Sequence, residues 1–187
     1  MPTSRGPRFF RLFRGIAAAA LIAAIAAIAA SARPAAAQVR ISLGAWHEPI
    51  LLDTLRQDHP LRAAPEKVYE ATLRAFADLD IPAGRTEGKA GIIGSERFER
   101  SRALRNVLLS KLYNCGEGPT GPFADSFRLE IAVIAWVTPS GTGSKLGLAT
   151  VASARDVSGV AHPSRACYST GTLETKIFEQ VAKIVGG

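Results

Sequence analysis

Four arginines within nine residues are the densest group of side chains in this sequence that could bind a ligand. A guanidinium group is planar, permanently charged and rich in N–H donors, which suits phosphate and carboxylate groups. Two glutamates, Glu96 and Glu99, lie among the arginines and dilute the positive field, so a solvated face with local ion pairs explains the same pattern. The cluster is still the best candidate for an anionic contact, and it consists of Arg97, Arg100, Arg102 and Arg105.

The three histidines, His47, His59 and His162, lack the spacing of a metal site. Metal-binding histidines usually have a second ligand close by, and only His162 has one, five residues before Cys167. His59 follows Asp58 and could be a base with an orienting carboxylate, but no nucleophile-elbow sequence accompanies the pair. We therefore predict no catalytic residue, no metal and no cofactor, and interpret the histidines as surface or strand-end residues.

Two short segments have the composition of anion-binding loops. Residues 141–145 combine glycines with a lysine, but the spacing is not that of a P-loop and no helix is expected to follow. A hairpin turn explains this segment better. Residues 169–172, Ser-Thr-Gly-Thr, precede an expected helix and could present backbone N–H groups to an anion, although ordinary helix capping accounts for them too.

The two cysteines predict one disulfide bond, because only one pairing exists. Cys115 and Cys167 lie in glycine-containing segments, where we expect regular structure to stop. They flank two strand-like runs, residues 127–138 and 145–156, so the bond would tie together the two ends of a hairpin. Two separate buried thiols are the alternative.

The hairpin itself is the element around which we expect the fold to form. In residues 127–138 apolar side chains occupy every second position, which places one apolar row on one face of a sheet. The connector, residues 139–144, is rich in Pro, Gly and Ser and predicts a turn. The apolar row consists of Phe127, Leu129, Ile131, Val133, Ala135 and Val137.

Helical periodicity predicts two main helices, over residues 64–80 and 172–185, and a short helix over residues 101–114. Two short strands are expected at 82–87 and 92–99, and irregular loops at 116–122 and 157–170. This order of elements predicts an α+β domain with a mostly antiparallel, curved sheet and both main helices on one face.

The first 37 residues have the layout of a secretory signal peptide. Arg5, Arg8, Arg11 and Arg14 precede an apolar run over residues 16–30, and Ala35-Ala36-Ala37 offers a cleavage site. The run of about 15 residues is shorter than the ~20 that span a bilayer, so cleavage is favoured over an uncleaved anchor. We expect a periplasmic or secreted protein without a stable membrane span after cleavage, with an arm and first strand at 38–59 and a single domain at 60–187.

Charge argues against a nucleic-acid partner. The whole chain carries 23 Lys and Arg against 16 Asp and Glu, a net charge of +7. Five of the arginines lie in the leader, and without it 18 basic residues face 16 acidic ones. A net charge of about +2 gives little support for binding to a polyanionic nucleic acid.

Three segments, Ala64-Pro65-Glu66-Lys67-Val68-Tyr69, Leu79-Asp80-Ile81-Pro82 and Gly91-Ile92-Ile93-Gly94, resemble the compact α+β domains of bacterial envelope lipoproteins. The similarity is to the third lipoprotein subunit of the outer-membrane β-barrel assembly machinery. The second half, residues 114–174, resembles uncharacterised exported bacterial proteins. The resemblance implies helices that grip a curved sheet. The chain departs from the lipoprotein in having no lipidation cysteine after the apolar run, so neither a membrane tether nor any functional residue is carried over from the resemblance.

The function expected from these patterns is non-enzymatic binding of a partner protein or an anionic envelope component. The alternative is a binder of a small apolar or amphipathic ligand, held between the concave face of the sheet and the C-terminal helix. A hydrolase without a recognisable motif is a third interpretation.

The leader generates the first testable prediction. Export followed by cleavage after Ala37 should give a mature protein whose N-terminal sequence begins at Gln38. Edman sequencing or intact-mass measurement of protein from the periplasm or medium checks this. A membrane-bound protein that retains the leader would contradict it.

Overall fold

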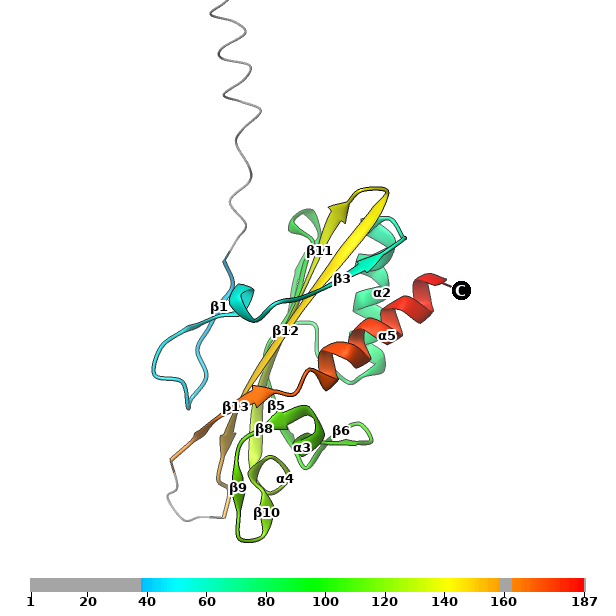
Figure 1. Cartoon of the computed structure of the whole chain (residues 1–187). Helices are drawn as coiled ribbons and strands as arrows, with labels where there is room; N and C mark the ends of the chain where they lie inside the picture. The colour runs from blue at the N-terminus through cyan, green and yellow to red at the C-terminus, as the bar shows by residue number, and fades with distance from the viewer. Residues whose placement is uncertain (1–37, 159–162, 187) are drawn as a thin grey trace, which may run out of the picture. The chain divides into compact units, whose positions relative to one another are not determined.

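A hairpin of two thirteen-residue strands, β11 (Arg128–Ser140) and β12 (Gly143–Arg155), forms the centre of the sheet, as predicted (Figure 1). The computed structural model describes residues 38–158 and 163–186. The two strands pair without interruption from Arg128 and Arg155 to Ser140 and Gly143. Gly141 has a φ of 57° at the turn, a left-handed conformation that glycine adopts at little cost.

Five shorter strands complete a seven-stranded sheet in which the observed pairings are antiparallel. On one side of the hairpin lie β5 (Ile92–Ser101) and then β4 (Arg85–Glu87). On the other side, β12 pairs with β3 (Gln57–Leu61) along its first half and with β13 (Arg165–Ser169) along its second half. The last strand, β8 (Tyr113–Asn114), pairs with β13.

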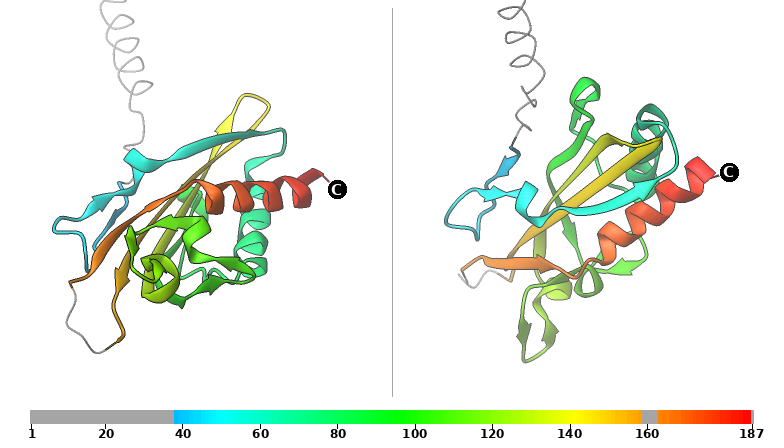
Figure 2. Two further views of the ribbon diagram at one scale, coloured as in Figure 1. Left: turned by 60° about the horizontal axis from the view of Figure 1, so that its bottom comes forward. Right: turned by 45° about the horizontal axis from the view of Figure 1, so that its top comes forward.

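Two helices, α2 (Pro65–Asp78) and α5 (Thr172–Gly186), cover one face of this sheet (Figure 2). Their apolar stripes pack on the alternating row of β11 that the sequence predicts. Burying a large apolar side chain contributes about 1.5–3 kcal/mol, so this layer is the main source of stability. The contact includes Val68, Ala75, Phe76, Ile177 and Val181 from the helices and Leu129, Ile131, Leu146 and Leu148 from the strands. The predicted α+β class, with two main helices on one face, is confirmed.

The ends of α2 follow from local chemistry. Pro65 occupies the first helical turn, where its missing N–H costs nothing. At the other end the N–H groups of Asp80 and Ile81 donate to the carbonyls of Ala77 and Phe76, at 3.1 and 2.8 Å. This is a Schellman motif, with Asp80 at the left-handed position (φ 56°).

The N-terminal arm covers the opposite face of the sheet. It contains β1 (Arg40–Ile41), β2 (Ile50–Leu51) and the 3₁₀ turn η1 (Leu52–Leu55). Among the described strands, β1 and β2 pair with each other and with no strand of the main sheet, so side chains hold the arm to the sheet. Buried arm residues Val39, Ile41, Leu43 and Leu52 contact a second apolar row that includes Ala132, Ile134, Trp136, Ala149 and Val151. The central strands are therefore buried on both faces.

The helix predicted over residues 101–114 is wrong. Strand β5 continues to Ser101, and the chain then forms a small hairpin of β6 (Ala103–Leu104) and β7 (Val107–Leu108), followed by one helical turn, α3 (Leu109–Leu112). Arg102 and Arg105 have φ angles of 66° and 50°, which cannot continue a right-handed helix. Of the apolar residues at helical spacing, Leu104 and Leu112 are buried and Val107 is half-buried, but Leu108 is 42% exposed, so these residues do not form one buried helical stripe.

The two predicted loops also contain regular structure. In the first, β9 (Glu117–Gly118) pairs with β10 (Gly121–Pro122), and the turn α4 (Phe123–Ser126) follows. In the second, β13 pairs with β12 through Cys167, Ala166 and Arg165. The sequence of β13 is short and partly polar, so it does not by itself predict a strand. Its conformation depends on pairing with β12. Residues 159–162 lie outside the described residues.

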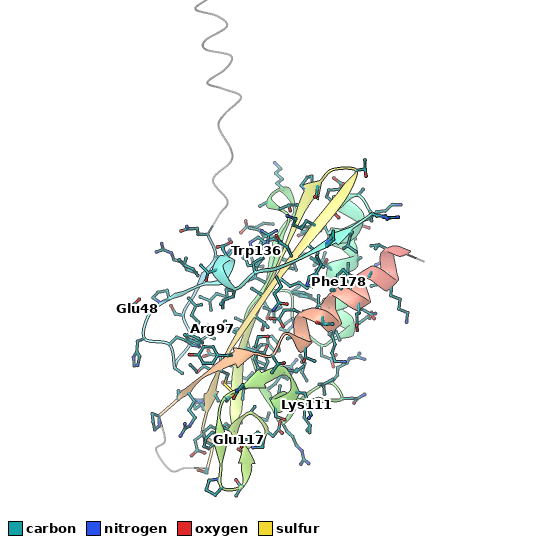
Figure 3. The ribbon with its side chains drawn as sticks, viewed as in Figure 1. Glu48, Arg97, Lys111, Glu117, Trp136 and Phe178 are labelled. Atoms are coloured by element: carbon teal, nitrogen blue, oxygen red, sulfur yellow. A yellow bond between two sulfur atoms is a disulfide. The ribbon has the colours of Figure 1, made fainter. Side chains whose placement is uncertain are left out.

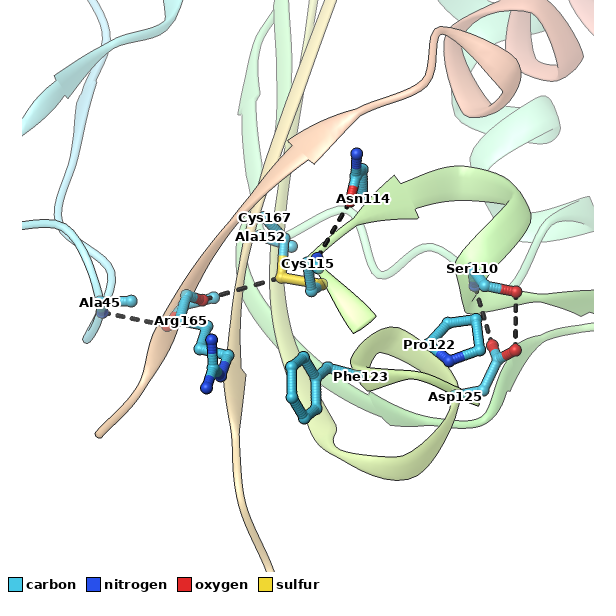
Figure 4. The surroundings of a disulfide bond; sticks show 12 residues. Ala45, Ser110, Asn114, Cys115, Pro122, Phe123, Asp125, Ala152, Arg165 and Cys167 are labelled. Carbon is cyan, nitrogen blue, oxygen red and sulfur yellow. Dashed lines mark hydrogen bonds between the residues drawn. A yellow bond between two sulfur atoms is a disulfide. The ribbon is translucent and has the colours of Figure 1, made fainter. Parts of the chain in front are cut away.

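The predicted disulfide between Cys115 and Cys167 is confirmed (Figure 4). Cys115 directly follows β8, whereas Cys167 lies inside β13, so the expectation that both lie where regular structure stops is wrong for Cys167. The two strands are adjacent, and the Cα atoms are 4.2 Å apart. Both cysteines are buried, and the bond fixes the segment that leads into α5.

Replacing either cysteine by serine should lower the free energy of unfolding by roughly 2–4 kcal/mol, the usual contribution of a native disulfide. Cys115→Ser, Cys167→Ser and the double variant should lose the same amount, because one bond is removed in each case. Denaturant unfolding under non-reducing conditions measures this. A double variant much less stable than either single variant, or two free thiols in protein purified without reductant, would contradict the role given to the bond.

Candidate functional site

Three arginines line a groove between the N-terminal arm and the edge of the sheet. Arg40 comes from β1, Arg85 from β4 and Arg97 from β5, and the groove has a volume of about 280 Å³. Figure 3 labels Arg97 between the arm and the sheet. The remaining wall of this arginine groove consists of Val39, Ile41, Ser42 and Ile134.

A glycine and a β-bulge bring Arg85 and Arg97 to the same face. Gly94 lies opposite Arg85 on one side and Ile134 on the other. A Cβ atom on Gly94 would lie 2.4 Å from Cδ1 of Ile134, so glycine leaves room for that side chain in the groove. Gly94 and Arg97 are three positions apart and would point to opposite faces of a regular strand. One extra residue in β5, where the register to β11 shifts between Ile131 and Val133, reverses this.

The arginines of the groove retain donors for a ligand. Nε of Arg85 donates to Oε1 of Glu87 at 2.6 Å, and Nη1 of Arg97 lies 3.6 Å from Oε1 of Glu130. Arg40 has no ion pair with any described residue. The Arg97 side chain is 59% exposed, so solvent screens its pairing. Because each guanidinium carries five N–H donors, the groove can accept an anion with several oxygen atoms.

Only Arg97 of the predicted four-arginine cluster lies in this groove. Arg100 donates through Nη2 to the backbone carbonyl of Asp80 at 2.7 Å, and Nε of Arg105 donates to the Asp80 carboxylate at 3.2 Å. Arg102 is exposed; its carbonyl accepts a hydrogen bond from the N–H of Leu109 at 2.9 Å, and its guanidinium has no polar partner among the described residues. The structure thus divides the cluster: Arg97 faces the arm, while Arg100 and Arg105 support the Schellman turn of α2. An anionic contact by these last residues stays a prediction.

Capping explains the segment before α5. The hydroxyl of Ser169 accepts a hydrogen bond from the N–H of Gly171 at 3.0 Å, and that of Thr170 accepts one from Thr172 at 3.4 Å. Thr170 also donates to the carbonyl of Lys111 at 2.7 Å. These N–H groups are satisfied within the protein, so the segment is a helix cap.

The histidines are dispersed. The His59 ring stacks on Phe178 with 4.5 Å between ring centroids, and burial lowers the pKa of His59 against the opposing effect of the Asp58 carboxylate. A neutral, packed imidazole fits this position. His47 is exposed in the arm, and His162 lies outside the described residues. In the described residues no group of three or more His, Cys, Asp or Glu side chains is placed to hold a metal ion.

A buried polar cluster lies where α5 meets the sheet. The Tyr113 hydroxyl is 2.5 Å from that of Thr150, which itself donates to the carbonyl of Ala132. Ser169 donates to the carboxyl of Glu174 at 2.8 Å. Burial raises the pKa of both Tyr113 and Glu174. Each hydroxyl has a partner, and the cluster anchors α5 rather than facing a ligand.

No protein-family model matches the sequence, and no curated protein matches it at a significant level. The arrangement of side chains in the arginine groove therefore carries the functional argument. Arg40 and Arg85 were missed in the sequence because they lie far from Arg97 along the chain. The alternation of residues along a strand could not reveal that Arg85 and Arg97 share a face, because the bulge in β5 interrupts that alternation. In residues 38–158 and 163–186 no helix combines the length and apolar character needed to cross a bilayer.

Glu174→Gln should make the protein more stable at pH 7. Burial disfavours the charged carboxylate in the folded state and so raises the pKa of Glu174 above the ordinary value of 4.5. The destabilisation is therefore absent below about pH 4.5 and grows as the pH rises through the folded-state pKa. Glutamine keeps the acceptor for Ser169 without the charge.

Urea unfolding of both proteins between pH 3.5 and 8 tests this. The difference in unfolding free energy should be largest at neutral pH and close to zero at the acid end. Glu179→Gln, at an exposed position of the same helix, is the matched control and should not stabilise the protein at neutral pH. A Glu174→Gln variant that is less stable at pH 7 would show that the carboxylate is stabilising.

Proposed function

We propose that this protein is an exported, non-enzymatic binding domain that recognises an anionic component of the cell envelope through the arginine groove. The observation that carries the proposal is the convergence of Arg40, Arg85 and Arg97, from three separate elements, on one groove. If these arginines only formed ion pairs on a solvated surface, there would be no reason for them to line a groove together. Charge complementarity selects an anion as the ligand.

The side chains of the groove support binding over catalysis. Arginine stays protonated at physiological pH, so it can orient and neutralise an anion but cannot accept a proton from it. The histidine that the sequence offered as a base, His59, is packed against Phe178 away from this groove.

Export is part of the proposal. The basic and apolar leader has the form of a signal peptide, and a disulfide is the expected state of two cysteines in an oxidising compartment. An envelope component that carries phosphate or carboxylate groups would then be available to the groove.

The alternative ligand site, between the sheet and α5, is less well supported. Side chains with 0% exposure, including Leu146, Leu148, Ile177 and Val181, occupy that interface. An apolar ligand there would have to displace core contacts, whereas an anion can enter the arginine groove without moving them.

Replacing Arg85 and Arg97 by glutamine should weaken binding to vesicles that contain anionic lipid, or to a soluble polyanion. A basic residue near an anionic surface contributes about 1 kcal/mol, so the double variant should lose about tenfold or more in affinity at low salt. The loss should shrink as ionic strength rises. Co-sedimentation over a salt series measures it.

Arg100→Gln/Arg102→Gln is the charge-matched control, because these residues lie outside the groove. It should bind nearly as well as the wild type. Loss of binding in this variant alone would move the anionic contact to the cluster predicted from sequence. Equal binding by all three proteins at every ionic strength would rule out both arginine sets.

A further inference from the structure

The arginine groove offers more donors and charge than a single carboxylate can use. Arg40 has no acidic partner among the described residues, and the described carboxylate nearest to Arg97 in an ion pair, that of Glu130, lies 3.6 Å away, beyond hydrogen-bond distance. Arg85 uses Nε for Glu87, and no described residue accepts a hydrogen bond from its Nη groups. Three partly free guanidinium groups match an anion with three terminal oxygens and up to two negative charges, as in a phosphate monoester.

The size and wall of the groove fit the same ligand. A volume of about 280 Å³ holds a phosphate group together with the first atoms of its ester substituent. Val39, Ile41 and Ile134 form an apolar side to the groove, against which a substituent can pack. A bare inorganic ion would leave this side unused.

We propose that the ligand recognised in the arginine groove is a phosphate monoester, carried either by a lipid headgroup or by a soluble molecule. This inference rests on the proposed function, because it names the ligand class of the same site. Arg85 and Arg97 hold the phosphate from the sheet, and Arg40 holds it from the arm.

Ligand binding should also secure the arm. Oδ2 of Asp53 accepts a hydrogen bond from the N–H of Val39 at 3.0 Å, and the Val39 carbonyl accepts one from Leu52 at 3.0 Å. A phosphate bridging Arg40 to the sheet adds an attachment beside these two bonds. Amide exchange at Leu52, whose N–H is bonded to Val39 in the wall of the groove, therefore reports on how firmly the arm is held when the ligand is bound.

The test titrates the purified protein, expressed from the full-length sequence, with glycerol 3-phosphate and with acetate at equal ionic strength, by calorimetry. Glycerol 3-phosphate should bind at least tenfold more tightly, and its affinity should fall as the pH drops through about 6, where the monoester loses its second charge. It should also slow amide exchange at Leu52. Arg85→Gln/Arg97→Gln should lose this preference, and Arg74→Gln, an exposed arginine of α2, should keep it.

Vesicles distinguish the two sources of the phosphate. Phosphatidic acid carries a monoester and phosphatidylglycerol a diester, so stronger binding to phosphatidic acid supports the proposal with a lipid as the source, even if glycerol 3-phosphate binds weakly. Equal affinity for acetate and glycerol 3-phosphate, together with equal binding to both lipids, would overturn the phosphate assignment and leave general anion binding intact. A protein that binds none of these anions would overturn the proposed function as well.

Discussion

The structure depends on the need to cover strands β11 and β12 on both faces. Their central side chains are apolar in both rows, so neither face can be left in water without a large loss of stability. The helices α2 and α5 cover one face, and the N-terminal arm, which lacks a continuous sheet of its own, covers the other. The arginine groove forms where β1 of this arm lies beside β4 and β5. The site is therefore a consequence of how the second face is closed.

The opposite end of the sheet uses different chemistry to position α5. Strand β13 is short and leads directly into the helix, so its place must be fixed by more than its own pairing. The disulfide joins it to β8, and the hydrogen bond between Ser169 and Glu174 joins the end of β13 to the first turn of α5. Arg165 adds a contact across Phe123, with its guanidinium carbon 4.2 Å from the ring centroid. Stability at this end thus includes covalent and buried polar contributions.

Much of the fold could be predicted because it rests on local patterns of the sequence. The central hairpin, both main helices and the disulfide follow from period-two alternation, period-3.6 alternation and the single cysteine pairing. Residues 101–114 could not be assigned correctly, because their apolar spacing fits a helix while Arg102 and Arg105 adopt left-handed conformations that no simple pattern marks. The groove was beyond prediction for a related reason. Its three arginines come together only through an arm folded onto the sheet and a bulge that reverses the direction of Arg97.

The arginine groove is suited to binding because the residues that hold the arm in place are apolar, whereas the residues that would bind the ligand are charged. The arm is held by buried apolar side chains, such as Leu52 with 0% exposure, and each contributes far more than a solvent-screened ion pair, whose contribution is about 0–1 kcal/mol. Arg40, Arg85 and Arg97 can therefore exchange a weak contact or water for a ligand without loosening the arm. Glu130 illustrates the balance, because its two oxygens face Arg97 and the N–H of Gly44 in the arm. An anion that takes over Arg97 leaves that carboxylate free to hold the arm, so ligand binding and arm docking do not oppose each other.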